Sequence, residues 1–402
     1  MDIVIISQYL SNIECLEDNN SRFLYLANLL RNCDDCEVEL ITSTFFHRFH
    51  RQAEFIDQPE GFKITALHEP GYKKNISLAR LYSHFILALN LKKYLEHRKR
   101  PDVIYCAVPS LDVAFQAAQY CKKYNIRFII DIQDLWPEAF KMVFNIPVIS
   151  NLAFYPMTLI ANSVYKEANE IVAVSDSYCK RAMSVNSSCR SSHTVFLGTN
   201  LETFDMNSKS TLPDFAIKED RLKLMYCGSL TPNYNLKIVI DALHHLDNMH
   251  EETPFFIIMG DGESRESFEA YAKELNVDCL FTGMLPYNEM CAMLSLADIV
   301  VNPISSGAAL SIINKHGDYA ASGCPVVSTQ ENLEYRNLID NYQMGFNCAC
   351  DDAEDLAAKL NLLIHDHTLR VSMGNNARRC AEERFDRRSS YQEIVDLIIN
   401  HD

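Results

Sequence analysis

The sequence predicts an α/β protein made of two doubly wound Rossmann-like domains that face a central cleft. Its 402 residues exceed what one hydrophobic core usually organises. Apolar residues make up 48% of the chain, and no low-complexity tract interrupts them, which indicates globular domains. In both halves, short apolar runs alternate with helical patterns, as in parallel sheets covered by helices. Ligands of such sheets bind beyond the carboxyl ends of the strands.

The first domain is predicted over residues 1–205. It begins with a buried strand at 2–6, followed after a polar loop by a helix from about Arg22 to Arg31. Further strands are expected at 38–42, 103–107, 128–131 and 171–174, with a helix at 111–124. The polar stretch 205–220 contains a proline and is predicted to link the two domains.

The second domain is predicted over residues 206–380. Strands are expected at 222–226, 255–259, 280–281, 299–301 and 326–327, with helices between them. The remaining residues, 381–402, are predicted to be a C-terminal helix that packs back on the first domain.

The charge of the chain is uneven. A formal net charge of -16 argues against nucleic acid as the main partner, because phosphate binding needs a basic face. Between Tyr72 and Arg100, however, eight basic residues accompany a single acidic one, Glu96. We call this segment the basic island; its basic residues are Lys73, Lys74, Arg80, Lys92, Lys93, Arg98, Lys99 and Arg100.

The apolar residues of the basic island have approximately helical spacing: Leu78, Leu81, Phe85, Ile86, Leu89 and Leu91. One interpretation is a helix packed on the core with a solvated basic back. The other is a surface for an anionic lipid headgroup or a phosphate-bearing acceptor. The residues assigned to this acceptor or membrane face are Lys73, Lys74, Arg80, Lys92 and Lys93.

The uncharged run 142–165 contains prolines and asparagines that a membrane-spanning helix tolerates poorly. It is expected either to enter a bilayer interface or to be buried in interdomain packing. The fourteen scattered cysteines indicate reduced thiols in a cytoplasmic protein. A metal site is not expected, because His47 and His50 follow the pair Cys33 and Cys36 too closely for a zinc finger.

The segment 303–325 is the strongest candidate for a ligand site. After the strand at 299–301, a small-residue loop leads to Ser311, a credible N-cap for a helix starting near Ile312. The amides of that helix and Lys315, supported by Asn314, would favour a pyrophosphate. Asp318 would share the side of Lys315 and accept hydrogen bonds from vicinal hydroxyls. The alternative is an ordinary Lys-Asp pair on a surface helix.

Two glycine turns follow strands in the same domain. Gly228 and Ser229 end one strand, and Gly260 and Asp261 end another. Glycine there would let backbone approach a phosphate or nucleotide that a side chain would block. The first domain contributes the segment 131–138, DIQDLWPE, after a strand; it holds the only tryptophan.

Five segments in chain order resemble the GT-B glycosyltransferases of the retaining family 4 type, especially the bacterial surface-polysaccharide branch. They are DLWPE, the Gly228-Ser229 turn, the Gly260-Asp261-Gly262 turn, the strand end at 281–283, and the block from Asn314-Lys315 to 323–325. The resemblance covers nearly the whole chain.

The resemblance implies that Gly228, Ser229, Asn314 and Lys315 form the cradle of a nucleotide-sugar diphosphate. Asp318 matches the second acidic position of the paired-acid motif of this family, which holds the ribose. The first position falls on Leu310, whose side chain accepts no hydrogen bond, so backbone near Ala309 and Leu310 is expected to serve.

The resemblance also implies the reaction. Lys315 is expected to stabilise the leaving diphosphate, with no metal or cofactor. Asp134 would orient or deprotonate the acceptor hydroxyl, with Glu138 one turn further on; alternatively, Asp134 caps a helix before Pro137. The expected function is transfer of a hexose-type sugar, with retention, to a lipid-linked glycan in capsule, O-antigen or exopolysaccharide synthesis at the inner membrane face. The alternatives are a sugar-nucleotide 2-epimerase and a non-catalytic sugar-nucleotide sensor.

Overall fold

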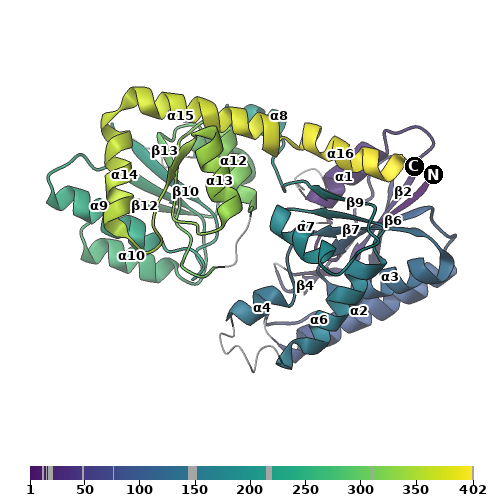
Figure 1. Cartoon of the computed structure of the whole chain (residues 1–402). Helices are drawn as coiled ribbons and strands as arrows, with labels where there is room; N and C mark the ends of the chain where they lie inside the picture. The colour runs from purple at the N-terminus through teal and green to yellow at the C-terminus, as the bar shows by residue number, and fades with distance from the viewer. Residues whose placement is uncertain are drawn as a thin grey trace. The chain divides into compact units, whose positions relative to one another are not determined.

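The computed structural model describes residues 1–10, 13–14, 16, 21–47, 49–75, 77–143, 152–213, 220–308 and 312–400. The chain divides into two compact units (Figure 1). The first unit comprises Met1–Val195 with Tyr391–Asp402, and the second comprises Phe196–Ser390. Each unit contains one parallel sheet flanked by helices, so the prediction of two doubly wound α/β domains is confirmed.

The first unit is built on a seven-stranded parallel sheet in the order β5-β2-β1-β6-β7-β8-β9. Its strands are β1 (Asp2–Ile6), β2 (Glu37–Ser43), β5 (Lys63–Leu67), β6 (Val103–Val108), β7 (Arg127–Ile132), β8 (Glu170–Ala173) and β9 (Ser191–Thr194). The short strands β3 (Phe45–Phe46) and β4 (Arg51–Gln52) pair antiparallel beside it.

Helices cover both faces of this sheet (Figure 1). They are α1 (Arg22–Leu30), α2 (Leu78–His97), α3 (Leu111–Tyr124), α4 (Glu138–Val143), α6 (Tyr155–Glu167), α7 (Asp176–Met183) and the last turns of α16 (Arg387–Ile399). Serine side chains start three of them: Ser21, Ser77 and Ser175 each accept a hydrogen bond from a first-turn amide.

The second unit has a six-stranded parallel sheet in the order β12-β11-β10-β13-β14-β15. Its strands are β10 (Lys223–Cys227), β11 (Phe255–Met259), β12 (Cys279–Gly283), β13 (Ile299–Asn302), β14 (Val326–Ser328) and β15 (Gly345–Asn347). Its helices are α8 (Leu201–Asn207), α9 (Leu236–Asn248), α10 (Arg265–Glu274), α11 (Tyr287–Leu294), α12 (Asn314–Ala321), α13 (Leu333–Tyr342), α14 (Ala353–His365) and α15 (His367–Cys380), followed by a π-helical turn (Ala381–Phe385). Apolar clusters fill both faces of the sheet.

The chain leaves the first unit earlier than the predicted boundary at 205/206. Leu201 and Phe204 are buried in an apolar cluster of the second unit, so the division falls after Val195. The return falls after Ser390 instead of 380, because residues 381–390 stay with the second unit. From Tyr391 onward, the buried residues Ile394 and Ile398 belong to the core of the first unit.

A buried ion pair fixes the end of β7. The Asp131 carboxylate is fully buried and lies 2.7 Å from Arg22 Nε. It also accepts hydrogen bonds from the Tyr105 hydroxyl at 2.7 Å and from Gln133 Nε2 at 2.6 Å. Because buried charges persist only with such partners, this network holds the start of the DIQDLWPE segment against the sheet.

The turns after β10 and β11 are packed backbone against backbone. Gly228 N donates to Met259 O at 2.9 Å, and Leu230 N donates to Asp261 O at 2.9 Å. A Cβ on Gly260 would lie 1.8 Å from Gly228 O. The glycine at 260 is therefore required by the Gly228 turn.

Gly260→Ala should destabilise the second unit by roughly 2 kcal/mol or more. The new Cβ would overlap Gly228 O, and the backbone φ of +157° is unfavourable for alanine. Urea unfolding followed by circular dichroism measures the loss. Gly307→Ala is the control: its φ is +71°, but a Cβ there meets no atom within 4 Å, so about 1 kcal/mol of strain is expected. An equal loss in the two variants would contradict the packing argument.

Candidate functional site

Helix α12 carries most of the predicted donor residues and starts later than predicted. Its first residue is Asn314 and its N-cap is Ile313, whose amide donates to His316 Nδ1 at 3.3 Å. His316 is itself buried and stacks on Tyr335 at 3.5 Å between ring centroids. The helix therefore starts two residues later than the predicted Ile312. The proposed cap Ser311 lies outside the described residues.

The side chain of Lys315 points into the second unit. It is only 8% exposed, and its Nζ lies 3.8 Å from the ring centroid of Tyr234 and 4.1 Å from that of Tyr226. Among the residues described, Nζ has no hydrogen-bond partner. Burial lowers the pKa of this amine to about 7. The alternative of a Lys315-Asp318 surface pair is therefore wrong.

Gly228 lies directly against this amine. A Cβ at position 228 would lie 2.7 Å from Lys315 Nζ, so glycine is needed there for the lysine to occupy its position. Ser229 is exposed, and its carbonyl accepts a hydrogen bond of 2.7 Å from the Tyr226 hydroxyl. The structure thus brings Gly228, Ser229 and Lys315 together, and it places Asn314 exposed on the first turn of α12.

Gly260 and Asp261 support the turn from its other side. Asp261 is exposed and its carboxylate accepts from Gly262 N at 2.8 Å, with Arg265 Nη1 at 3.8 Å. Its side chain is thus engaged within its own turn, while Gly260 contacts Gly228.

Asp318 has partners within the second unit. Its Oδ1 accepts hydrogen bonds from Thr199 Oγ1 at 2.7 Å and from the Tyr287 hydroxyl at 3.0 Å. Burial raises the pKa of this carboxyl group. Ala309 and Leu310, also predicted for the donor, lie outside the described residues.

In the first unit, Asp134 is bonded within its own loop. Its carboxylate accepts from Leu135 N at 2.8 Å and from Trp136 Nε1 at 3.2 Å, and α4 begins only at Glu138. The alternative role of a helix cap is thus not seen. Burial is the main cause that raises the pKa of Asp134, and the negative charge of Glu138 adds to it. Glu138 itself forms an ion pair of 2.6 Å with Arg181.

Sequence reasoning missed an aromatic cluster beside Arg80. The Arg80 guanidinium lies 4.8 Å from the Trp136 ring centroid and 5.5 Å from that of Tyr72, and Nη2 donates to the Tyr9 hydroxyl at 3.1 Å. His84 stacks on Trp136, and burial lowers its pKa to about 3. These side chains come from distant segments, so no local pattern could reveal the cluster.

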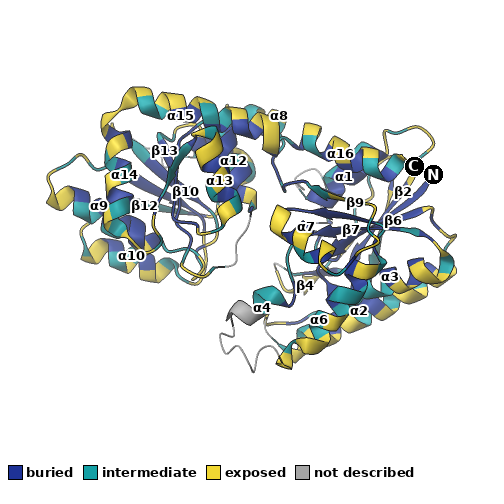
Figure 2. Cartoon of the chain, in the orientation of Figure 1, coloured by how far each residue is buried: buried dark blue, intermediate teal, exposed yellow. Residues whose placement is uncertain are grey.

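Helix α2 orients its apolar residues differently from the core-packed interpretation. Five large residues are exposed along its outer side: Leu78 (84%), Leu81 (47%), Tyr82 (60%), Phe85 (51%) and Leu89 (42%). The buried residues of this helix are Ser83, His84, Leu87, Ala88, Leu91 and Leu95. Figure 2 shows exposed positions recurring along this helix. The interpretation in which the predicted apolar stripe packs on the core is therefore wrong, except at Leu91, which is buried, and at Ile86, which is partly buried.

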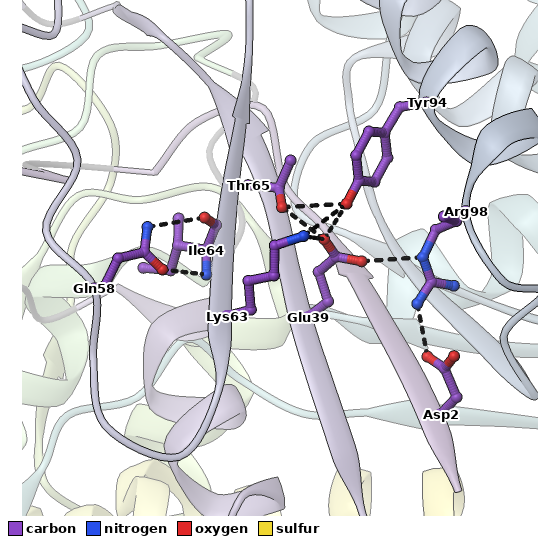
Figure 3. Close-up of polar contacts among 8 residues, drawn as sticks. All are labelled: Asp2, Glu39, Gln58, Lys63, Ile64, Thr65, Tyr94 and Arg98. Atoms are coloured by element: carbon purple, nitrogen blue, oxygen red, sulfur yellow. Dashed lines mark hydrogen bonds and ion pairs between the residues drawn. The ribbon is translucent and has the colours of Figure 1, made fainter.

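Five basic residues of the basic island divide into two groups. Lys73, Lys74, Lys92 and Lys93 are exposed, with no ion-pair partner in the described part of the chain. Arg98 is fixed at the end of α2: its Nε lies 3.0 Å from Glu39 Oε2, and its Nη2 lies 2.8 Å from Asp2 Oδ1 (Figure 3). Glu39 also accepts from Thr65 and Tyr94. This network anchors α2 on β1 and β2.

The described residues also bear on metal binding and membrane insertion. They contain no group of three or more His, Cys, Asp or Glu side chains arranged to hold a metal ion. The cysteines described are free thiols. None of the helices described has the length and apolar character needed to span a bilayer. Within the run 142–165, Leu152, Tyr155 and Leu159 are exposed, whereas 144–151 lie outside the described residues.

Comparisons with known proteins agree with this geometry. Residues 208–380 match the glycosyl transferases group 1 family. A protein of Campylobacter jejuni subsp. jejuni serotype O:2 is 24% identical over 362 residues, which are 89% of this chain and 88% of that protein. Its name is GalNAc-alpha-(1->4)-GalNAc-alpha-(1->3)-diNAcBac-PP-undecaprenol alpha-1,4-N-acetyl-D-galactosaminyltransferase.

Solved structures of low sequence identity share the fold. Sucrose-phosphate synthase from Thermosynechococcus elongatus has a TM-score of 0.73 at 14% identity, over 99% of this chain and 98% of that one. HepE from Anabaena in complex with UDP has a TM-score of 0.71 at 16% identity, over 99% of both chains. Residues 208–380 are therefore a glycosyl transferases group 1 domain, and the chain is a glycosyltransferase with the GT-B fold.

Proposed function

We propose that this glycosyltransferase moves a hexose-type sugar, with retention, from a nucleoside-diphosphate donor to a hydroxyl of a lipid-linked glycan in the synthesis of a bacterial surface polysaccharide. The observation that carries the proposal is the Lys315 amine, buried beside the Gly228 turn without an anionic partner among the described residues. A buried cation of this kind fits a ligand that supplies negative charge. The name of the Campylobacter relative supports a lipid-linked acceptor.

The expected chemistry follows from the charges of the reaction. When the bond between the anomeric carbon and the diphosphate breaks, negative charge grows on the leaving group. A positioned ammonium interacts more strongly with the charge that has developed in the transition state than with the ground state. Lys315 would therefore contribute to the rate. Gly228, Ser229 and Asn314 would complete the cradle, and Asp318 would meet the ribose. This scheme needs neither metal nor cofactor.

Asp134 is proposed to orient or deprotonate the acceptor hydroxyl. Burial raises its pKa, which makes the carboxylate a stronger base than an exposed aspartate. The carboxylate must be ionised to accept a proton, so this role would weaken as pH falls through the raised pKa. Glu138 would act on Asp134 through its negative charge, which adds to the rise in the pKa of Asp134. Its own carboxylate is engaged in an ion pair with Arg181.

The outer side of α2 is proposed to contact an anionic membrane surface. Its exposed leucines and aromatic residues lie next to exposed lysines, a combination that favours binding to an anionic bilayer interface. Cytoplasmic location at the inner leaflet would follow, because lipid-linked acceptors present their glycans there.

The reaction class is tested by nucleoside-diphosphate release with and without a lipid-linked glycan acceptor. Transfer predicts release that depends on the acceptor. Conversion of the donor sugar without any acceptor would instead indicate an epimerase. Absence of both reactions, with donor binding retained, would indicate a sensor.

Lys315→Ala should lower kcat by roughly a hundredfold or more while weakening donor binding much less, because its charge acts chiefly on the leaving group. Initial rates and calorimetric donor binding measure the two effects. Lys237→Ala is a matched control, since Lys237 also lies over a tyrosine ring, 4.9 Å from the centroid of Tyr271, but is exposed. Equal losses of kcat and of donor affinity would count against the assignment.

Replacing Lys73, Lys74, Lys92 and Lys93 by glutamate should abolish flotation with phosphatidylglycerol-containing liposomes at low salt, because exposed charges attract an anionic surface only within a Debye length. Leu81→Ser with Phe85→Ser should also reduce flotation, since both side chains are about half exposed. Four glutamates at lysines of the second unit, 209, 237, 273 and 359, are the control. A wild-type protein that stays in the soluble fraction would refute the membrane contact.

A further inference from the structure

The Lys315 amine is enclosed by two aromatic rings. Its Nζ lies 3.8 Å from the ring centroid of Tyr234 and 4.1 Å from that of Tyr226. The two ring centroids are 5.9 Å apart, and the ring planes cross at 65°. An ammonium over aromatic faces is stabilised by the ring quadrupoles. This stabilisation replaces only part of the hydration that burial removes.

Among the residues that the structure describes, no carboxylate forms an ion pair with the Lys315 amine. The titratable groups that face Lys315 come from β10 (Tyr226, Cys227), from the following turn (Tyr234) and from α12 (His316, Asp318, Tyr319). Burial raises the pKa of the Cys227 thiol to about 12 and lowers the pKa of His316 well below its usual range, so both are neutral. The tyrosine hydroxyls also have raised pKa values. Asp318 forms no ion pair with Lys315 and bonds Thr199 and Tyr287 instead.

The rings are held independently of the lysine. The Tyr226 side chain is fully buried, and its hydroxyl donates to Ser229 O at 2.7 Å. Tyr234 N donates to Thr231 O at 3.0 Å, which fixes the turn that carries the second ring. Gly228 closes a third side, because a Cβ there would lie 2.7 Å from Nζ. The amine therefore has a defined position before any ligand arrives.

We propose that Tyr226 and Tyr234 are positioning residues that hold the Lys315 amine away from water at the Gly228 turn, and that the nucleoside diphosphate leaving group binds there with uptake of one proton by this amine. The inference rests on the proposed function in one respect, namely that the diphosphate binds at Lys315. It adds that the two rings, through desolvation, set the protonation state of the amine in the free enzyme. The diphosphate then supplies the negative charge that stabilises the ammonium.

The sign of the pH dependence follows from this arrangement. In the free enzyme the amine has a pKa of about 7 and is therefore mostly neutral at pH 8. A bound diphosphate raises that pKa, because opposite charge favours the ammonium. Between the two pKa values, diphosphate affinity should fall about tenfold for each pH unit as pH rises. Below pH 6 the amine is already protonated, and its contribution to the pH dependence disappears.

Calorimetry at pH 8 in buffers of different ionisation enthalpy counts the protons taken up. The probe is whichever of UDP, GDP, ADP and dTDP gives the largest thermal shift; at this pH their phosphates are fully ionised, since the second pKa of a phosphate is about 6. Wild type should take up about 0.9 proton per diphosphate. Tyr234→Phe keeps the ring and should give the same count.

Tyr234→Ala lets water reach the amine, which raises its pKa toward the ordinary value of a lysine, so the count should fall below about 0.3 proton. A purely structural role of the ring would not change the proton count. A wild-type count near zero, or an unchanged count in Tyr234→Ala, would overturn the inference.

Lys315→Met separates this inference from the proposed function. If wild type takes up a proton, and the variant binds the nucleoside diphosphate at least tenfold more weakly without proton uptake, both stand. If it binds more weakly but wild type takes up no proton, the diphosphate site stands and the role of the rings fails. If it binds as tightly as wild type, the diphosphate lies elsewhere, and both the site and the role of the rings fail.

Discussion

The Gly228 turn depends on the burial of one amine that has no counter-charge among the described residues. Lys315 is 8% exposed, and its Nζ contacts two tyrosine rings in place of water. That position requires glycine at 228, and the Gly228 turn in turn requires glycine at 260. Burial of an amine disfavours its charged form, so a buried amine without a partner is suited to a substrate that supplies the missing negative charge. This is the reason for proposing that the leaving diphosphate binds at Lys315.

The first unit combines a rigid interior with an unusual surface. The buried pair of Asp131 with Arg22 fixes the end of β7, from which the loop carrying Asp134 departs. On the outside, α2 exposes leucines and aromatic rings beside lysines that have no ion-pair partner among the described residues. Such a surface is poorly suited to water alone and suits an anionic lipid interface.

Sequence patterns predicted the interior strands of both sheets, because buried parallel strands are short apolar runs. They missed β5, β9 and β15, which lie at the edges of the sheets. They predicted the start of α12 less well: the helix begins at Asn314, and the imidazole of His316 accepts a hydrogen bond from the amide of the N-cap residue Ile313. On α2, two apolar stripes have helical spacing, and spacing alone does not say which faces the sheet. Tyr226 and Tyr234 went unnoticed because they precede Lys315 by a whole run of strands and helices, so only the folded sheet brings them together.

A crystal structure with a bound nucleoside diphosphate tests the central claim most directly. The account predicts that an oxygen of the terminal phosphate lies within about 3 Å of Lys315 Nζ, the distance of a charge-assisted hydrogen bond. The amine should remain between the rings of Tyr226 and Tyr234, with the phosphate at the Gly228 turn. A diphosphate bound elsewhere, with Lys315 still lacking an anionic partner, would contradict it.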